Sequence, residues 1–392
     1  MIKHFTHIIL LLVLLVSLFC CSKSNDIVES EQDDASDDIL VGVAYFAGWH
    51  EEEPSENKWI KYPWSEPEKI DFTKKGNPQW AGREPLLGKY NVQATMDAEI
   101  AAAAAYGVDF FCILWYYWNN APETKQASIK RLNRGLEQYL ASPNKNKMKF
   151  MMEACNADGH LSVTSEAGWD SIATVFVDVA KDPAYLRIDG RPVFKIHSPG
   201  RFYTQLNSDI SRCQNVIQNF RQKAKNAGLG DIVIAVGTYG NGKISNGHNY
   251  TNYGIDCTMQ YAGLPETNVL PKGHYPYSEL TDYVESIRDL RKFDALNWVP
   301  YIMSGWDASP WGGENRSTFD FPTREQWNSE LNAIKDDLLT SPSLGFPKKD
   351  GTTQKAFTIY AWNEFGEGGI VAPTVGEQYM KLEEIKKVFG NE

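Results

Sequence analysis

The stretch ATMDAEIAAAAAYGVDFFCILWYYW, residues 94–118, decides the fold class, because it holds a helix, a stop and a strand in immediate succession. The alanine-rich run Ala94–Tyr106 predicts a helix, and Gly107 tolerates the left-handed backbone that ends one. The apolar and aromatic run Asp109–Trp118 that follows predicts a buried strand. These 25 residues therefore predict one helix–strand unit of an α/β protein.

The same unit recurs along the chain. Short apolar runs predict eight strands, and amphipathic stretches lie between most of them. The predicted strands are Val41–Trp49, Asp109–Trp118, Lys149–Asn156, Pro192–His197, Asp231–Tyr239, Ile255–Tyr261, Trp298–Ser304 and Ala356–Trp362. The clearest predicted helices are Ala94–Tyr106, Gln126–Leu140, Trp169–Ala180, Asp209–Ala227, Leu280–Phe293 and Glu325–Leu339.

Eight strands that alternate with helices predict an α/β fold of the (β/α)8 TIM-barrel type, in a single domain. An open, doubly wound sheet gives a similar alternation and is the alternative. Two observations favour the barrel: the glycine-rich phosphate turn of a dinucleotide-binding sheet is missing after the first strand, and polar or aromatic residues follow nearly every strand. The connection 51–87 is rich in Trp, Pro and Glu, and we expect it to cover one edge of the active face.

The N-terminus has the pattern of an export signal. Residues 8–15 are an unbroken apolar run, too short for a permanent membrane anchor. Cys21 follows this region, so residues 1–21 resemble a bacterial lipoprotein signal whose cysteine becomes acylated. Cys20 fits the same role, and an ordinary signal peptide with an incidental cysteine pair is the alternative.

A polar, acidic segment at residues 22–38 then precedes the domain at 39–392. Such a segment buries too little apolar surface to fold, which predicts a solvated tether. We therefore expect a monomer in the cell envelope, attached to the outer membrane only through lipid, on its periplasmic face or at the surface.

Composition excludes several classes of partner. The net charge of -11 argues against nucleic acid or an anionic membrane surface, because either favours a basic patch. Cys112, Cys155 and Cys257 lie in apolar runs, as small buried side chains do, and no Cys-x-x-Cys or His-x-x-x-His pair occurs. We expect no cofactor and no metal.

Aromatic rings, carboxylates and amides follow the predicted strands, whose carboxyl ends converge on one face of a barrel. Sugars need this mixture, since their C–H faces stack on aromatic rings and their hydroxyls need many hydrogen-bonding partners; phosphorylated ligands would call for Arg or Lys. We expect an oligosaccharide or polysaccharide substrate. The predicted contacts are Tyr45, Trp49, Trp115, Tyr116, Glu153, His197, Tyr239, Tyr261, Trp306, Asp307, Trp311 and Asn363.

The most informative segment is IYAWNEFGEGG, residues 359–369. Glu364 and Glu367 are separated by a glycine turn, so both can face one side although a regular strand would point them to opposite sides. Paired carboxylates are the minimal equipment for glycoside hydrolysis, and we predict that these two are catalytic. A pair of surface glutamates in a turn is the alternative.

Several blocks, in this order, resemble glycoside hydrolase family 99 and its WbsX-like relatives, over nearly the whole of residues 39–392. The blocks are Tyr45 and Trp49, Gly88–Asn91, Tyr106–Phe111 leading into Trp115–Trp118, Gly190–Phe194, Ser304–Asp307 with Pro310 and Trp311, and Trp362–Gly368 followed by Pro373.

The resemblance implies a (β/α)8 barrel and a retaining, metal-independent, endo-acting α-mannosidase. By that likeness Glu364 assists the 2-hydroxyl of the substrate as an internal nucleophile, while Glu367 protonates the leaving oxygen and then activates water. The chain departs from the hydrolase motif at Phe365–Gly366, where Trp-His is usual. The WbsX-like relatives are often described as associated with glycosyltransfer, and the departure leaves the sugar preference open.

Three functions are compatible with these features. A hydrolase fits an exported protein, because the cell envelope contains polysaccharide but no supply of nucleotide sugars. The alternatives are a noncatalytic glycan-binding lipoprotein and a WbsX-like glycosyltransferase or transglycosylase of surface polysaccharide. The sequence has neither an Asp-x-Asp motif nor a basic pocket for a nucleoside diphosphate, which a transferase with such a donor would need.

Overall fold

The computed structural model describes residues 39–49, 78–90, 92–118, 121–156, 163, 165–238, 250–265, 269–292, 296–311 and 317–390. Residues 39–392 cluster as one compact unit. The predictions for Cys20, Cys21 and the tether lie outside the described residues. Among the described helices, none combines the length and the apolar character that a membrane span requires.

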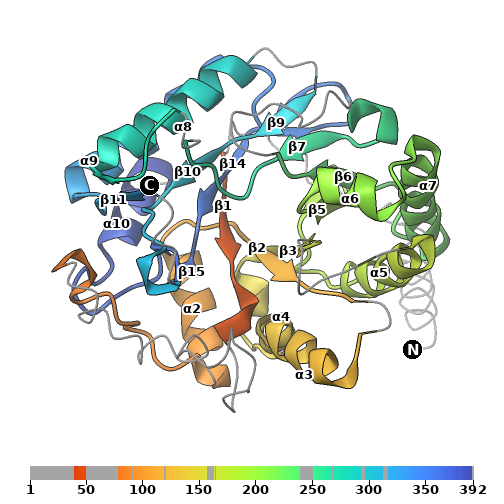
Figure 1. Cartoon of the computed structure of the whole chain (residues 1–392), viewed down its shortest axis with the longest axis horizontal. Coiled ribbons are helices and arrows are strands. Elements are labelled where there is room, and N and C mark those ends of the chain that lie inside the picture. The colour runs from red at the N-terminus through yellow and green to blue at the C-terminus, as the bar shows by residue number, and fades with distance from the viewer. Residues whose placement is uncertain are drawn as a thin grey trace, which may run out of the picture. The chain divides into compact units, whose positions relative to one another are not determined.

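A parallel sheet forms the centre of this unit, and helices surround it (Figure 1). Its strands follow the order β10-β14-β1-β2-β3-β5-β6-β7-β9. Their bounds are β1 (Leu40–Tyr45), β2 (Phe110–Trp115), β3 (Lys149–Ala154), β5 (Arg191–Ile196), β6 (Val233–Val236), β7 (Cys257–Met259), β9 (Asn297–Val299), β10 (Tyr301–Met303) and β14 (Ala356–Tyr360). The fold is a (β/α)8 TIM barrel, as predicted, and not an open doubly wound sheet.

The barrel closes at Pro300. The predicted single strand Trp298–Ser304 is two strands, of which β9 pairs with β7 and β10 pairs with β14. Proline has no amide hydrogen to give to a ladder, which interrupts the strand. Its carbonyl oxygen still accepts a hydrogen bond from the Thr358 amide at 2.9 Å. β10 is the first strand in the order above and β9 is the last. Because only Pro300 separates them in the chain, the two edges of the sheet meet there and the sheet closes into a barrel.

All six predicted helices are present, with one division. The predicted helix Gln126–Leu140 is two helices that meet at Asn133, whose side chain exchanges two 2.8 Å hydrogen bonds with the backbone of Tyr116. Two helices, α6 and α10, were not predicted. The bounds are α2 (Gln93–Ala105), α3 (Glu123–Leu132), α4 (Arg134–Ala141), α5 (Glu166–Val179), α6 (Pro199–Gln205), α7 (Ile210–Asn226), α8 (Tyr277–Arg291), α9 (Arg324–Thr340) and α10 (Met380–Phe389).

Short strands and 3-10 turns connect the main elements of the barrel, and some of them lie at the carboxyl ends of its strands. Between β6 and β7 the described residues contain a 3-10 turn where a regular repeat would have a helix. The short strands pair as β4 (Arg187–Ile188) with β5, β8 (His274–Tyr275) with β11 (Thr318–Phe319), β12 (Phe346–Pro347) with β13 (Thr353–Gln354), and β15 (Asn363–Glu364) with β16 (Gly369–Ile370). The 3-10 turns are η1 (Ala47–Trp49), η4 (Pro78–Trp80), η5 (Lys145–Lys147), η7 (Tyr250–Tyr253) and η8 (Ser309–Trp311).

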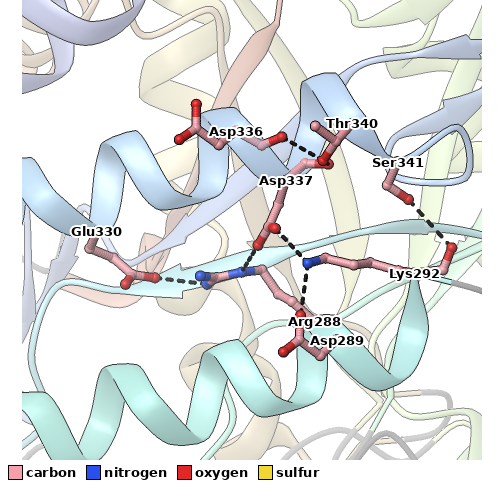
Figure 2. Close-up of polar contacts among 8 residues, drawn as sticks. All are labelled: Arg288, Asp289, Lys292, Glu330, Asp336, Asp337, Thr340 and Ser341. Atoms are coloured by element: carbon pink, nitrogen blue, oxygen red, sulfur yellow. Dashed lines mark hydrogen bonds and ion pairs between the residues drawn. The ribbon is translucent and has the colours of Figure 1, made fainter.

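Charged side chains fix α8 against α9 (Figure 2). The buried guanidinium of Arg288 donates to Glu330 at 2.8 Å and to Asp337 at 3.0 Å, and Lys292 reaches Asp337 at 2.6 Å. Burial raises the pKa of Glu330, although the positive charge of Arg288 opposes the shift. A packing of α8 on α9 that separated these partners would leave a buried charge uncompensated. The network therefore favours the observed contact between the two helix faces.

Candidate active site

The two predicted catalytic carboxylates lie in a tight hairpin after β14. Glu364 ends β15, which pairs antiparallel with β16. The amides of Glu367 and Gly368 both donate to the Glu364 carbonyl oxygen at 2.9 Å. Gly368 has φ of 82°, a left-handed conformation that glycine adopts without strain. The Glu-x-x-Glu segment is therefore a closed turn at the carboxyl end of a barrel strand, where barrel enzymes carry their chemistry.

Glu364 is the more buried of the pair, with 5% of its surface exposed. The hydroxyl of Tyr261, just beyond β7, donates to its Oε1 at 2.5 Å. Burial, and then the nearby charge of Glu367, raise the pKa of Glu364 well above its usual range, and the hydrogen bond from Tyr261 partly offsets this rise. These surroundings stabilise the protonated form of Glu364 relative to that of an exposed glutamate.

Glu367 is half-buried, and the hydroxyl of Tyr360, the last residue of β14, donates to its Oε2. The rings of Tyr360 and Tyr261 meet edge to face, with centroids 5.1 Å apart. Each carboxylate is thus held by one of two touching tyrosines. The half-exposed carboxylate is the one that a ligand or a water molecule can reach more easily.

The residues flanking Glu364 anchor the hairpin to the segment after β1. The side chain of Asn363 is fully buried and exchanges hydrogen bonds with the backbone of Phe46, at 2.8 and 3.0 Å. Trp49 is buried as well, and its Nε1 donates to the Asn363 carbonyl oxygen at 2.6 Å. Phe365 packs edge to face against Trp49, so it points into the core. The structure gives Asn363 and Trp49 supporting contacts within the protein, and their predicted contact with substrate stays a prediction.

A buried glutamate that the sequence analysis missed ties three segments together beside the hairpin. Glu99 on α2 accepts hydrogen bonds from the Tyr45 hydroxyl at 2.6 Å, from the Trp362 Nε1 at 2.7 Å and from the Tyr90 hydroxyl. Burial raises the pKa of Glu99 to about 7, and the three hydrogen bonds limit the rise. One feature of the sequence could have indicated this residue: Glu99 is a carboxylate within an apolar, alanine-rich predicted helix. Tyr45, predicted to contact substrate, is fully buried and bonded to Glu99.

A second buried carboxylate, Glu153 on β3, lies in a cluster of charged groups. Lys195 on β5 donates to its Oε2 at 2.9 Å, and the Nδ1 of His197 lies 2.6 Å from its Oε1. Burial alone would raise the pKa of Glu153, but the charge of Lys195 and the hydrogen bond from His197 lower it to about 2. His197 stacks edge to face on Tyr261, with centroids 5.3 Å apart, so this cluster borders the catalytic pair. Lys195 was missed because it lies within an apolar strand.

Other predicted contacts lie at the same ends of the strands. The Trp115 ring stacks on Tyr117 with centroids 5.9 Å apart, and burial raises the pKa of Tyr116, as do the nearby Cys155 and Glu364. Trp306 packs 5.7 Å from Tyr360; within the part of the chain that the structure describes, its buried Nε1 has no hydrogen-bond partner.

Asp307 is fully buried and accepts hydrogen bonds from protein groups. Its Oδ2 accepts from the Trp80 Nε1 at 2.8 Å and from the Gln79 Nε2 at 3.0 Å, and its Oδ1 accepts from the Ser309 amide at 2.9 Å. The described end of the long connection after β1 therefore reaches the active face. Gln79 and Trp80 carried no catalytic pattern in the sequence and were missed.

Two predicted contacts cannot be placed. Tyr239 and the side chain of Trp311 lie outside the described residues, although the backbone of Trp311 ends η8. Over the described ranges, no group of three or more His, Cys, Asp or Glu side chains could hold a metal ion.

The described residues form a TIM-barrel domain that carries a pair of carboxylates at the carboxyl end of β14. The chain belongs to the WbsX family, because the family model described as "Glycosyltransferase WbsX" matches residues 83–385. This confirms the expected WbsX-like domain. A comparison with curated proteins gives no match.

Solved structures share the fold. A "glycoside hydrolase-like protein" superposes with a TM-score of 0.59 at 13% sequence identity, over 91% of this chain and 95% of that chain. The family 99 endo-α-mannosidase from Bacteroides thetaiotaomicron has a TM-score of 0.52 at 14% identity, over 91% of this chain and 96% of its own. At these identities the likeness is one of fold.

The raised pKa of Glu99 predicts a specific dependence of stability on pH. Between pH 4.5 and about 7 the unfolded chain ionises this group while the folded protein keeps its proton. Its contribution is complete below pH 4.5 and is lost as pH rises to about 7, a change on the order of 3 kcal/mol. Glu99→Gln keeps the shape without the titration. Urea unfolding should show wild type losing stability relative to this variant across that range.

The exposed Glu325 offers a matched control, since Glu325→Gln also removes one carboxylate from a helix. Its free energy of unfolding should run parallel to that of wild type at every pH. If Glu99→Gln ran parallel to wild type as well, the assignment of a raised pKa to Glu99 would be wrong.

Proposed function

We propose that this chain is a retaining glycoside hydrolase that cleaves an oligosaccharide or polysaccharide, with the chemistry of an endo-α-mannosidase. The observation that carries the proposal is the carboxylate pair Glu364 and Glu367 in one turn at the carboxyl end of β14. Each is held by a tyrosine hydroxyl, and the pKa of one is raised. Two carboxyl groups in different environments supply an acid and a base, which glycoside hydrolysis requires.

The difference in burial supports a division of roles between the two carboxylates. Half-buried Glu367 is accessible to the glycosidic oxygen and to water, which suits the group that protonates the leaving oxygen and later deprotonates water. Buried Glu364 suits the group that takes the proton of the sugar 2-hydroxyl. The 2-oxygen then attacks C1 as the leaving oxygen receives the Glu367 proton, which gives a 1,2-anhydro sugar. Water opens that ring, losing a proton to Glu367, and the 2-oxygen recovers its proton from Glu364.

The two displacements at C1 each invert the configuration, so the product keeps the anomeric configuration of the substrate. Glu364 must be ionised to accept the 2-hydroxyl proton, although its surroundings raise its pKa. A pair of interacting carboxyl groups titrates as a unit, and the productive form has one proton, on Glu367.

Replacing either carboxylate by its amide separates these roles. Glu364→Gln and Glu367→Gln should each lower kcat on an unactivated α-linked glycan by a factor on the order of 100 or more, with little change in stability. On a substrate whose leaving group needs no protonation, such as a dinitrophenyl glycoside, Glu367→Gln should recover kcat/KM, which reports the first displacement, while Glu364→Gln should not. Release of reducing ends and of dinitrophenolate measures the two cases.

Near wild-type activity of both variants on a confirmed substrate would remove the pair from catalysis. Early NMR spectra that show an inverted product, or undiminished cleavage of a 2-deoxy substrate, would contradict the 2-hydroxyl route. If wild type binds glycans and releases no product from a panel of α-mannans and other polysaccharides, the chain is a binding protein.

The Tyr261 hydroxyl lowers the pKa of Glu364, so its removal should be visible in the pH profile. In Tyr261→Phe the carboxylate loses its hydrogen bond, its pKa rises further, and the acid limb of kcat/KM should move to higher pH. Tyr277→Phe is the matched control, because this buried hydroxyl donates to the Met303 carbonyl oxygen at 2.6 Å and to no carboxylate. An acid limb that moves to lower pH, or equally in both variants, would exclude Glu364 as the titrating base.

The description of the family favours one second function, transfer of a sugar. The same site would perform it if an acceptor hydroxyl, instead of water, opened the 1,2-anhydro ring. Elongated products in the presence of added acceptor glycans would identify this activity, and free reducing sugar alone would identify hydrolysis.

We further propose that the mature chain is lipid-anchored at Cys21, or at Cys20, in the cell envelope. The cysteines follow an apolar run and precede an acidic segment. Wild type should partition into detergent, and a variant with both cysteines replaced by Ser should partition into water. Aqueous partitioning of both proteins would reject the anchor.

A further inference from the structure

Asp307 connects the catalytic turn to the segment around η4. Its amide donates to the Glu367 carbonyl oxygen at 2.7 Å. Its carboxylate accepts from Trp80 at 2.8 Å and from Gln79 at 3.0 Å. A single fully buried residue therefore contacts a catalytic residue through its backbone and a distant segment through its side chain.

The turn and the Asp307 loop pack with no free space between them. A Cβ atom added at Gly368 would lie 2.6 Å from the Asp307 amide nitrogen, and one added at Gly305 would lie 2.8 Å from the Gly368 carbonyl oxygen. Both glycines have positive φ, 82° and 142°. A shift of Asp307 must therefore be transmitted to Glu367, whose carboxylate is fixed on its other side by Tyr360.

The η4 segment is itself anchored on elements far away in the sequence. Gln79 donates to the Phe319 carbonyl oxygen at 3.3 Å and accepts from the Phe321 amide at 3.0 Å. Arg83 forms an ion pair with Glu377, which Lys381 joins at 2.7 Å. These contacts hold the indole of Trp80 in place, so its N–H donates to Asp307 from a fixed support.

We propose that Trp80 and Gln79 are positioning residues for Glu367, acting through Asp307. This inference rests on the proposed function, because it assigns Glu367 the transfer of a proton to the leaving oxygen. Proton transfer needs the acid within hydrogen-bond reach of that oxygen, and a displacement of about 1 Å is enough to slow catalysis. The side chains that fix Asp307 therefore set the rate of the proton-dependent step more than the affinity for substrate.

The test compares two fully buried tryptophans whose N–H groups donate to different acceptors. Trp80 and Trp327 are both fully buried; Trp80 donates to the Asp307 carboxylate, and Trp327 donates to the Lys381 carbonyl oxygen at 3.1 Å. In wild type the Trp80 ring meets the Phe321 ring edge to face, with centroids 5.1 Å apart. Trp80→Phe keeps an aromatic ring at this position. In this variant kcat on an unactivated glycan should fall about 10-fold, with KM little changed. Activity on a dinitrophenyl glycoside should stay near wild type.

Trp327→Phe should lose a similar amount of thermal stability and show no dependence on the leaving group. Gln79→Leu keeps approximate size and removes the second donor to the Asp307 carboxylate, so it should repeat the selective loss of Trp80→Phe. Equal losses on both substrates in Trp80→Phe and Gln79→Leu, or the same selective loss in Trp327→Phe, would overturn the inference. Failure of the proposed function is a separate result: wild type would then cleave neither substrate.

Discussion

Buried Glu364 and half-buried Glu367 lie within one four-residue turn, so the two carboxylates repel each other and lose hydration. The rest of the site compensates for that cost. Desolvation of even one charge is expensive unless hydrogen bonds or opposite charges replace water. Glu364 and Glu367 each receive a tyrosine hydroxyl, from Tyr261 and Tyr360. These donors stabilise charge without adding a positive charge, which would ionise both carboxylates and leave no acid. The pair can thus keep one proton between its members.

The barrel treats its other buried carboxylates in two contrasting ways. Glu153 faces the ammonium of Lys195, and its pKa falls to about 2. Glu99 faces only neutral donors, and its pKa rises to about 7. An ion pair therefore stabilises the anion of Glu153 beside His197, whereas the surroundings of Glu99 stabilise its protonated form relative to that of an exposed glutamate. Both residues hold together segments at the same face of the barrel. Of the two, only Glu99 has a pKa near neutrality, so its contribution to the free energy of unfolding changes with pH there.

The sequence predicted the barrel because periodicity and glycine stops are local signals. The helix at 94–106 and the strand after it were predicted within a few residues of their observed bounds. The division at Pro300 was missed because closure of the ring depends on which strands become neighbours. The break at Asn133 was missed because its cause is a hydrogen bond to Tyr116, 17 residues earlier.

The candidate site was predictable at its centre and less so around it. The Glu364–Glu367 turn is a single segment, so sequence alone could place both carboxylates together. Whether a polar residue at the end of a strand meets substrate or the protein depends on partners distant in sequence: Asn363 binds the backbone of Phe46, and Asp307 binds Trp80, 227 residues away. Such partners leave no periodic pattern in either segment.

The name of the family and the fold point to two reactions that one site could perform. Hydrolysis and transfer differ only in whether water or a sugar hydroxyl opens the activated sugar, and both need an acid, a base and a way to exclude the wrong nucleophile. Under the proposed function, the carboxylate pair supplies the acid and the base. Exclusion of the wrong nucleophile depends on what covers the half-exposed side of Glu367. The hydroxyl of Tyr360 donates to Glu367, and the indole of Trp306 packs on the Tyr360 ring. Under the proposed function, an aromatic surface beside Tyr360 would favour the apolar face of an acceptor sugar over water, and would therefore favour transfer over hydrolysis.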